Sequence, residues 1–273
     1  MVSLYFRTLD KIAPSLVAKK IFQLMSKPRI KKKRDFEEAV LEQAEQETIR
    51  FQGFDIQTYQ WGNPEHKVAL CIHGWEGQAG NFGGMVEPLL AQGYQVIAFD
   101  APSHGRSSNG EMNMFDIVDL AEQLAIQYQP EILISHSFGS VVSAMTLKRQ
   151  KELKLKHWFM ITTPQKYVHY IKSVTDFLGV SEKTFQKVVK KNEEFLNISI
   201  QEMDMAIYCQ DLDNVAQATI IHSVKDKIIP IDKARVVHEA FEQSEMIELD
   251  HLGHYSILWS DETKAILTQK LAV

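Results

Sequence analysis

Short apolar runs recur along most of this chain, and segments with helical spacing of apolar residues lie between them. The runs are VALCI (68–72), QVIAF (95–99), EILIS (131–135), HWFMI (157–161), ATIIHS (218–223) and MIEL (246–249). The helical segments cover residues 80–92, 113–128, 138–151, 231–243 and 260–271. Apolar strands that alternate with helices are typical of a parallel sheet, because helices then cover both of its faces. The pattern therefore predicts an α/β fold with a mostly parallel sheet.

The segments outside this alternation predict additions to the sheet. Residues 165–215 separate the fourth and fifth apolar runs, and their Lys, Glu, Phe and Met residues recur at helical spacing. This segment is too long for a simple crossover and indicates a small inserted helical cap. Residues 4–25 also show helical spacing, which Pro14 interrupts, so they predict one or two short helices.

The stretch between these helices and the first apolar run changes character along its length. Residues 35–47 are acidic and polar, and we expect a helix there. Residues 48–61 alternate in a strand-like way and are punctuated by Gly53, which predicts a hairpin. We therefore divide the chain into three parts: an N-terminal basic helical arm at residues 1–47, an α/β core at residues 48–164 and 216–273, and a helical cap insertion at residues 165–215.

The charge of the chain is unevenly distributed. The formal net charge is -5, which is too small to indicate a nucleic-acid binding protein. Residues 1–34 contain ten Lys and Arg against the single Asp10, so they carry +9 and leave -14 on the rest, with much of the excess in Lys31, Lys32, Lys33 and Arg34. The arm either contacts an anionic surface such as a membrane or lies solvated against the acidic body of its own fold. We favour the second interpretation, because positive charge attracts polyanions without specifying one.

The composition indicates an ordinary globular protein, with 45% hydrophobic and 24% charged residues. No apolar run approaches the ~18 residues of a membrane span, and the first residues show no secretory signal pattern. Cys71 and Cys209 are the two cysteines, and Cys71 lies inside an apolar run. A disulfide framework is therefore not expected, and we expect a cytoplasmic protein.

The segment EILISHSFGSVVSAMTL contains the candidate nucleophile. Its strand ends at Ser135, Ser137 follows at once, and a helix begins behind it. A serine in such a tight turn projects its hydroxyl above the sheet edge, at a helix N-terminus that favours negative charge. The usual motif for this turn is G-x-S-x-G, and Gly139 keeps its second glycine while Ser135 replaces the first. We expect the turn to persist, because serine is small.

The segment CIHGWEG, at residues 71–77, is the candidate oxyanion loop. It follows the first apolar run, and Gly74 after His73 lets the backbone turn its amides toward the nucleophile. Acyl transfer needs two donors aimed at the developing alkoxide. We therefore predict that the backbone N–H groups of Trp75 and Phe138 form the oxyanion hole.

The last two apolar runs are followed by an acid and a base. Asp226 comes just after ATIIHS, and His254 follows Gly253 after MIEL. An imidazole can take the serine proton and return it to the leaving group, while the carboxylate holds the imidazole in the correct tautomer. The chain order Ser137, Asp226, His254 is the order expected of this kind of site.

Other histidines compete with His254, but their positions favour structural or solvated roles: His73, His136, His222 and His251. The Asp and His residues have no metal-ligand spacing, and no glycine-rich phosphate loop is present. We therefore expect no metal and no cofactor.

These segments together resemble the α/β-hydrolase superfamily over residues 48–272. VIAFDAPSHGRSS is similar to the superfamily's Asp-x-Pro-x-His-Gly-x-Ser segment, with Asp100, His104 and Gly105 at the matching positions. HGWEG combined with the HSFG elbow also resembles a group of uncharacterised bacterial hydrolases. Some superfamily members carry the acid after the strand that corresponds to HWFMI, and TTPQ in this chain has no carboxylate there, which favours Asp226.

The resemblance implies an α/β-hydrolase fold and a Ser137–Asp226–His254 triad. It also implies that several residues near the site support its loops rather than take part in the chemistry: His73, Gly74, Asp100, His104 and Gly139. The expected reaction is hydrolysis of a carboxylic ester or thioester through an acyl-enzyme, since the haloalkane dehalogenases and epoxide hydrolases of this superfamily need an aspartate nucleophile instead.

The expected substrate is a small-molecule ester or thioester with an apolar group. The cap contains apolar residues that would suit such a group or would instead anchor the cap to the body: Tyr167, Tyr170, Ile171, Phe177, Phe185, Phe195, Met203 and Met205. Lactonase, amidase, carbon–carbon hydrolase and cofactor-free haloperoxidase activities use the same triad and stay open. A catalytically silent binding protein with this fold is the alternative from a different class.

Overall fold

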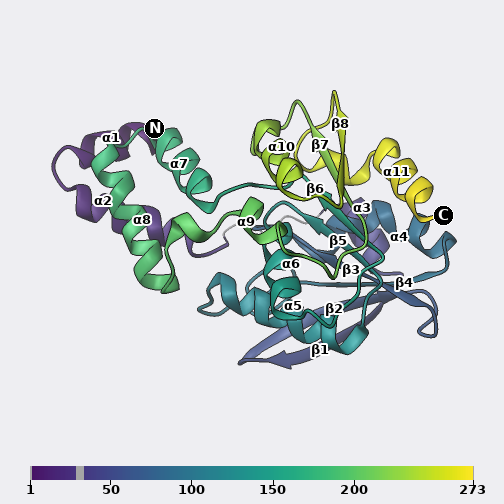
Figure 1. Ribbon diagram of the computed structural model, residues 1–273. Coiled ribbons are helices and arrows are strands. Elements are labelled where there is room, and N and C mark those ends of the chain that lie inside the picture. Colours follow the sequence, from purple (N-terminus) through teal and green to yellow (C-terminus); the bar gives the residue numbers. More distant parts are fainter. Residues whose placement is uncertain (1, 29–33, 273) are drawn as a thin grey trace.

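The computed structural model describes residues 2–28 and 34–272, and the predicted basic run at Lys31, Lys32 and Lys33 lies outside the described residues. An eight-stranded sheet with the order β1-β2-β4-β3-β5-β6-β7-β8 forms the centre (Figure 1). The strands are β1 (Glu45–Phe51), β2 (Phe54–Trp61), β3 (Lys67–Ile72), β4 (Tyr94–Phe99), β5 (Ile132–His136), β6 (His157–Ile161), β7 (Ala218–Ser223) and β8 (Ser244–Leu249).

The strands from β3 to β8 pair in parallel, and the hairpin β1–β2 adds two antiparallel strands at one edge. All six residues of β4 and all six of β7 are buried, which explains their continuous apolar sequences. Parallel strands end at the same edge of a sheet, so the loops after β3, β5, β7 and β8 meet there. The prediction of a mostly parallel α/β sheet is confirmed.

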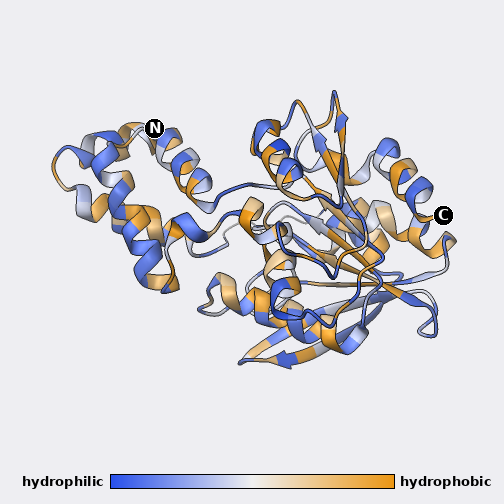
Figure 2. Cartoon of the chain, in the orientation of Figure 1, coloured by the Kyte–Doolittle hydropathy of each residue, from blue (hydrophilic) through white to orange (hydrophobic). Residues whose placement is uncertain are grey.

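Helices cover both faces of the sheet because alternate strand residues point to opposite sides. On one face Leu70 and Ile97 pack with the helices α5 (Met114–Tyr128), α6 (Phe138–Arg149) and α10 (Ile231–Ala240). On the other face Ala69 and Val96 pack with α4 (Gly83–Ala91) and α11 (Asp261–Leu271). Figure 2 shows the resulting pattern, with hydrophobic strands at the centre and hydrophilic stretches on the outside of the helices.

Four helices form a separate body, which we call the helical lobe. It consists of α1 (Val2–Asp10) and α2 (Pro14–Met25) from the arm together with α7 (Tyr167–Leu178) and α8 (Glu182–Leu196) from the insertion. Figure 1 shows the lobe at the left of the sheet. Helix α2 packs along α8, and Val17, Ala18 and Ile21 are fully buried there. Two pairs of helices that the sequence separates by more than a hundred residues therefore share one apolar interior.

Helix α1 crosses the turn between α7 and α8, and its side chains hydrogen-bond to the C-terminus of α7 and to the N-terminus of α8. The Ser3 hydroxyl donates to the Leu178 carbonyl at 3.1 Å, while Asp10 accepts from the Ser181 amide at 2.7 Å and from the Thr184 hydroxyl. Free carbonyls at a helix C-terminus and free amides at an N-terminus need such partners. Helices α1 and α2 of the arm thus pack on the inserted helices, whereas we expected the basic residues 1–34 to lie against the acidic body.

A short stalk connects the lobe to the core. The segments on either side of the insertion form an antiparallel bridge between Lys166 and Asp204, whose side chains also make an ion pair at 3.2 Å. The amide of Tyr167 donates to the Met203 carbonyl. Helix α9 (Met205–Cys209) then returns the chain to the core, where it packs against α6 and α10. The stalk leaves the sheet after β6, at the carboxyl edge.

The structure corrects the helix predicted at residues 35–47. Helix α3 (Asp35–Leu41) is shorter, and β1 already begins at Glu45. Pairing with β2 over the whole length of the strand outweighs the weak local preference, and β1 lies at the edge of the sheet with mostly exposed side chains. The first three residues of β1 are exposed and show no apolar alternation, so the sequence pattern placed the hairpin only from residue 48 onward. Of the residues that the structure describes, none lies in a helix long and apolar enough to cross a membrane.

Candidate active site

Ser137 lies in a strained turn between β5 and α6. Its φ of 53° and ψ of -123° are unusual for a residue with a side chain. Such a conformation costs about 1–3 kcal/mol and persists only where its surroundings impose it. The Ser137 amide donates to the Ile161 carbonyl at 2.8 Å, which fixes the turn to β6. The strained turn lies at the N-terminus of α6, as the motif predicts.

Two glycines allow the loops around Ser137 to approach closely. A Cβ at Gly139 would lie 2.1 Å from the Ile72 carbonyl oxygen, and a Cβ at Gly74 would lie 3.0 Å from Cβ of Ser137. The first distance is far inside van der Waals contact with backbone atoms, so only glycine fits there. These close approaches bring the candidate oxyanion loop next to the candidate nucleophile.

Ser135 replaces a glycine in the usual motif, and the structure gives a reason for its hydroxyl. Ser135 is fully buried, and its Oγ accepts from the Trp158 indole nitrogen at 2.9 Å and lies 3.0 Å from Oγ of Ser140. A buried indole N–H without an acceptor would cost about 1–3 kcal/mol. The serine therefore tethers β5 to β6 and α6 below the turn.

The amides proposed for the oxyanion hole lie on adjacent loops. The rings of Trp75 and Phe138 are half-buried and meet edge to face at 6.2 Å. Among the hydrogen bonds of residues 2–28 and 34–272, neither backbone N–H of these two residues donates to a protein acceptor. Amides without a protein partner beside a serine hydroxyl are what an oxyanion hole requires.

Asp226 and His254 are hydrogen-bonded to each other. Nδ1 of His254 lies 2.7 Å from Oδ2 of Asp226, and both side chains are buried. The other carboxylate oxygen accepts from the amides of Ile228 and Ile229 at 2.8 and 3.0 Å. Burial raises the pKa of Asp226, but the hydrogen bonds from His254 and the two amides outweigh it, so the pKa lies below its usual value. The carboxylate is therefore ionised and orients the imidazole with Nε2 left for another partner.

His136 joins the loops of the nucleophile and the base, a role that the sequence did not reveal. Its Nε2–H donates to the His254 carbonyl at 2.8 Å, and the two imidazole rings lie 4.8 Å apart. Burial, with the nearby His254, holds the pKa of His136 well below its usual value. A neutral imidazole next to Ser137 in the chain thus contacts the backbone of His254, which brings Ser137 and His254 to the same edge of the sheet.

His73 and Asp100 brace the oxyanion loop from below. The Ala101 amide donates to Nε2 of His73 at 3.0 Å, so the proton is on Nδ1, which donates to the Gly74 carbonyl at 2.7 Å. Asp100 accepts from the amides of Ala79 and Arg106, both at 2.8 Å. His104 is buried, with its ring 5.1 Å from that of His73 and 5.2 Å from that of Trp75.

Glu37 on α3 also supports this loop, and sequence reasoning missed it. The buried carboxylate accepts from the side-chain amides of Gln78 at 2.6 Å and Asn81 at 3.0 Å, directly after the oxyanion loop. Arg34 forms an ion pair with Glu37, and its guanidinium lies 5.7 Å above the ring of Tyr255, next to His254. Helix α3 therefore touches both the oxyanion loop and the base loop.

Several apolar cap residues hold the lobe together. Tyr167 donates to the Asn192 side chain at 3.2 Å, and Phe195 packs edge to face on Phe22 of α2 at 5.3 Å. Ile171 and Met205 are buried, whereas Phe177 is 78% exposed. These contacts join helices of the lobe to one another, so they do not decide between the lining of a substrate site and the anchoring of the cap to the body.

The other histidines that competed with His254 have different partners. His222 is buried with its Nε2 3.8 Å from Oδ2 of Asp226, and it donates to the Ile229 carbonyl at 2.9 Å. Exposed His251 lies 3.2 Å from Glu262. Thr162 and Thr163 are buried where other sites of this type carry the acid. Within residues 2–28 and 34–272, no three His, Cys, Asp or Glu side chains are grouped so that they could hold a metal ion.

Comparison with protein families gives a match to the alpha/beta hydrolase family over residues 69–179, which include Trp75 and Ser137. A serine hydrolase-like protein of Danio rerio is 33% identical over 93 residues, which cover 31% of this chain and 28% of the relative. The chain therefore spans less than a third of the length of this curated relative.

Solved structures resemble the chain over a larger part of its length. A thioesterase domain from the curacin biosynthetic pathway has a TM-score of 0.64 at 19% identity and covers 84% of this chain and 99% of its own. The esterase Pf2001 of Pyrococcus furiosus has a TM-score of 0.63 at 18% identity and covers 90% of this chain and 96% of its own. At such low identity these matches show a shared fold.

Proposed function

Because this chain belongs to the α/β-hydrolase superfamily, we propose that it hydrolyses a carboxylic ester or thioester through an acyl-enzyme on Ser137. One observation carries the proposal. The buried pair of His254 and Asp226, with 2.7 Å between Nδ1 and Oδ2, is linked by the His136–His254 hydrogen bond to the strained strand-to-helix turn that holds Ser137. Nucleophilic catalysis needs an oriented imidazole within reach of a serine hydroxyl, and we infer that His254 and half-buried Ser137 supply this pair.

The first half of the reaction forms the acyl-enzyme. Oγ of Ser137 attacks the carbonyl carbon of the substrate, and Nε2 of His254 takes the hydroxyl proton. The tetrahedral intermediate then collapses, the bond to the leaving alcohol or thiol breaks, and His254 donates the proton to it. Asp226 stabilises the imidazolium that exists between these steps. In the second half, water loses a proton to His254 and attacks the acyl group, which releases the acid and restores Ser137.

The amides of Trp75 and Phe138 stabilise the oxyanion of both tetrahedral intermediates. Removing one such donor typically costs about 3–4 kcal/mol of barrier. The N-terminus of α6 adds a favourable partial positive charge at the same place. The half-buried rings of Trp75 and Phe138 flank the nucleophile, which favours an apolar group on the substrate.

Labelling with a fluorophosphonate tests the proposal. The probe phosphonylates an activated serine, so the wild-type chain should be labelled and peptide mapping should find the label on Ser137. Ser137→Ala should abolish labelling, while Ser140→Ala, which removes a neighbouring buried hydroxyl, should leave it. An unlabelled wild-type chain, or a label on another residue, would show that the chain is a silent binding protein or uses another nucleophile.

A substrate panel separates esters from the other reactions of the same triad. We expect p-nitrophenyl esters and acyl thioesters to be cleaved, with a preference that depends on acyl chain length. The esterase and thioesterase names of the two structural neighbours supply these substrate classes. Faster turnover of a lactone, an amide or a carbon–carbon bond would replace the proposed substrate class without changing the role of Ser137.

A further inference from the structure

The helical lobe carries the most exposed of the large apolar side chains among the described residues. Among the described residues, the four large hydrophobic side chains with the greatest exposure are Ile12 at 81%, Phe177 at 78%, Leu4 at 69% and Val2 at 61%. All four belong to α1, α7 or the turn after α1. Scattered single apolar residues are normal on a protein surface, but a concentration on one small body marks an interaction surface.

The lobe is also basic, whereas the rest of the molecule is acidic. Residues 2–28 and 167–196 contain ten Lys and Arg against five Asp and Glu, a net charge of +5. One of those acids, Asp10, is buried against the N-terminus of α8. The other described residues, 34–166 and 197–272, carry a net charge of -14. The lobe therefore attracts an anionic partner while the core repels it.

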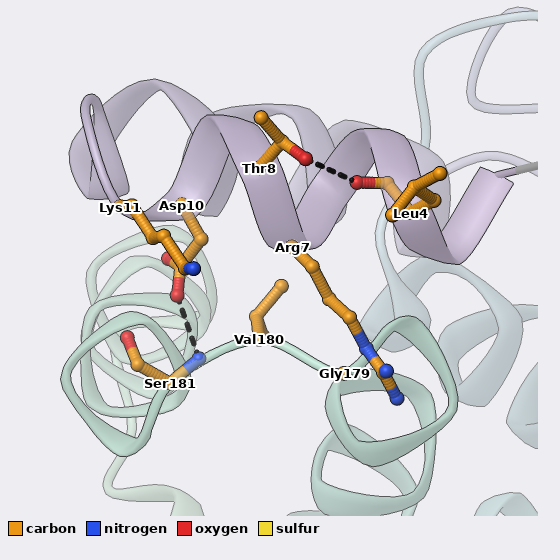
Figure 3. A pocket seen from close by; sticks show the side chains of 8 residues that line it. All are labelled: Leu4, Arg7, Thr8, Asp10, Lys11, Gly179, Val180 and Ser181. Carbon is orange, nitrogen blue, oxygen red and sulfur yellow. Dashed lines mark hydrogen bonds between the residues drawn. The ribbon is translucent and has the colours of Figure 1, made fainter.

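Basic and apolar side chains share the same part of the lobe. An open hollow of about 550 Å³, lined among others by Leu4 and Val180, lies between α1 and the α7–α8 turn. Figure 3 shows Arg7 of α1 and Lys11, just after α1, reaching toward this turn. The Arg7 side chain passes directly over Gly179, since a Cβ there would lie 2.0 Å from its Nε. Phe177 lies two residues before this turn. On the neighbouring helix, Lys20 donates to the Tyr5 hydroxyl at 2.8 Å.

We propose that the helical lobe docks on the surface of an anionic phospholipid bilayer. In this arrangement Ile12, Leu4 and Phe177 enter the region between the headgroups, and Arg7 and Lys11 pair with lipid phosphates. Interfacial segments combine exposed aliphatic and aromatic side chains with lysine and arginine in this way. A nucleic acid offers no environment for aliphatic groups, and the acidic core of a second copy would satisfy only the charges. The bilayer is the partner that accommodates both properties.

Co-sedimentation of the full-length chain with vesicles tests the proposal. The chain should sediment with vesicles of phosphatidylglycerol and phosphatidylcholine in equal parts and stay in the supernatant with phosphatidylcholine alone. Raising the salt from about 0.1 M to about 1 M should release it, since the Debye length falls from about 10 Å to about 3 Å. Lys11→Gln and Lys19→Gln should each weaken binding about fivefold.

Matched variants separate the penetration of apolar side chains into the bilayer from general electrostatic attraction to it. Ile12→Asp should reduce sedimentation strongly, whereas Ile126→Asp, at a 49% exposed position of α5 in the core, should behave like wild type. Circular dichroism of each variant establishes that it is folded. Wild-type chain that stays in the supernatant with anionic vesicles, equal sedimentation with both vesicle types, or an Ile12→Asp variant that sediments like wild type would overturn the proposal. A dimer in gel filtration that Ile12→Asp dissociates, without vesicle binding, would assign the surface to a second copy instead.

The result of the co-sedimentation experiment does not depend on the proposed hydrolase reaction. Ser137→Ala changes no residue of the lobe and should sediment like wild type. An unlabelled chain that sediments contradicts only the proposed hydrolysis, and a labelled chain that does not sediment contradicts only the docking.

Discussion

His136 is the residue through which the nucleophile turn contacts the base loop. Its hydrogen bond to the His254 carbonyl crosses 118 positions of sequence and joins two loops that otherwise belong to different strands. The contact does not touch the reacting atoms, so His136 is a positioning residue. A looser His254 would spend less time aligned with Ser137.

We expect His136→Phe, which keeps a ring but removes the donor, to lower kcat about tenfold with little change in KM. Leaving the buried His254 carbonyl without its donor costs about 1–3 kcal/mol. Part of this energy is lost from the alignment of His254 in the transition state, which lowers kcat. Steady-state kinetics with a soluble ester measures kcat and KM separately. His136→Gln should have a higher kcat than His136→Phe, because the glutamine amide can replace the hydrogen-bond donor. His251→Phe changes an exposed histidine of the same loop and serves as the control. A rise in KM alone would contradict the positioning role.

Asp226→Asn tests the orientation of the base. The amide keeps the shape of the side chain but removes the charge and favours the wrong tautomer of His254, so kcat should fall by roughly 10³–10⁴. Asp250→Asn, at an exposed carboxylate after β8, should leave kcat unchanged. If both variants hydrolyse esters equally well, Asp226 is not the acid of the site.

Residues at strand ends could be predicted from the sequence, while residues that act across loops could not. Ser137, Asp226 and His254 each follow an apolar run, so the sheet alone brings them toward one edge. Glu37 and His136 act through hydrogen bonds to Gln78 and to the His254 carbonyl, which lie 41 and 118 positions away. No local periodicity encodes such partners, because only the tertiary fold brings them together.

At the scale of elements, α1 is fixed by the helix ends that it covers. Asp10 accepts from the Ser181 amide and the Thr184 hydroxyl at the N-terminus of α8. Burial raises the pKa of Asp10, but these hydrogen bonds outweigh it, and the pKa lies below its usual value. A carboxylate with a lowered folded pKa stabilises the folded state above its unfolded pKa of about 3.9, and this stability is lost as the pH falls through the folded value.

Asp10→Ala should therefore destabilise the chain by about 1–2 kcal/mol at neutral pH, the usual cost of a lost cap. The difference between wild type and variant should shrink below about pH 4, when the wild-type carboxylate takes up a proton. Urea unfolding at several pH values measures this difference. Asp176→Ala removes an exposed carboxylate of α7 and should have a small effect at every pH. If the difference in unfolding free energy between wild type and Asp10→Ala grows as the pH falls, ionised Asp10 does not cap α8.

The edge strand β1 shows where the predicted bounds of an element fail, since the hairpin was expected only from residue 48. The buried strands β3 to β7 were predictable because both of their faces are apolar, whereas β1 exposes most of its side chains. Its strand conformation depends on seven paired positions with β2, from Glu45 opposite Gln60 to Phe51 opposite Phe54. Acidic and polar residues at 35–47 therefore suggested a longer helix than the seven residues of α3.

On the scale of the whole molecule, the arm and the insertion depend on each other. Val17, Ala18 and Ile21 of α2 and Val188 of α8 are fully buried, and burial of each larger aliphatic side chain contributes about 1.5–3 kcal/mol. The sequence predicted one or two helices in the arm and a helical insertion. It could not identify the partner of the arm, because the apolar face of an amphipathic helix does not specify which other helix it packs against.

Removing residues 2–28 should expose the apolar faces of α7 and α8. We expect greater binding of an apolar dye and rapid proteolysis between residues 167 and 196, while the core keeps its protection. Limited proteolysis with mass spectrometry locates the cleavage sites. A truncated chain in which residues 167–196 resist protease as well as in the full-length chain would show that the two inserted helices fold without the arm.

The discontinuous lobe also sets an order of events during synthesis. Helix α1 leaves the ribosome long before α8, since Asp10 and Ser181 are 171 positions apart. At about 5–20 residues per second the nascent arm waits roughly 10–30 s for the segment that buries its apolar face. During that interval the α/β sheet is still incomplete, because β7 and β8 follow the insertion. Completion of the lobe therefore precedes closure of the sheet, and α1 and α2 meet their partner helices late in synthesis.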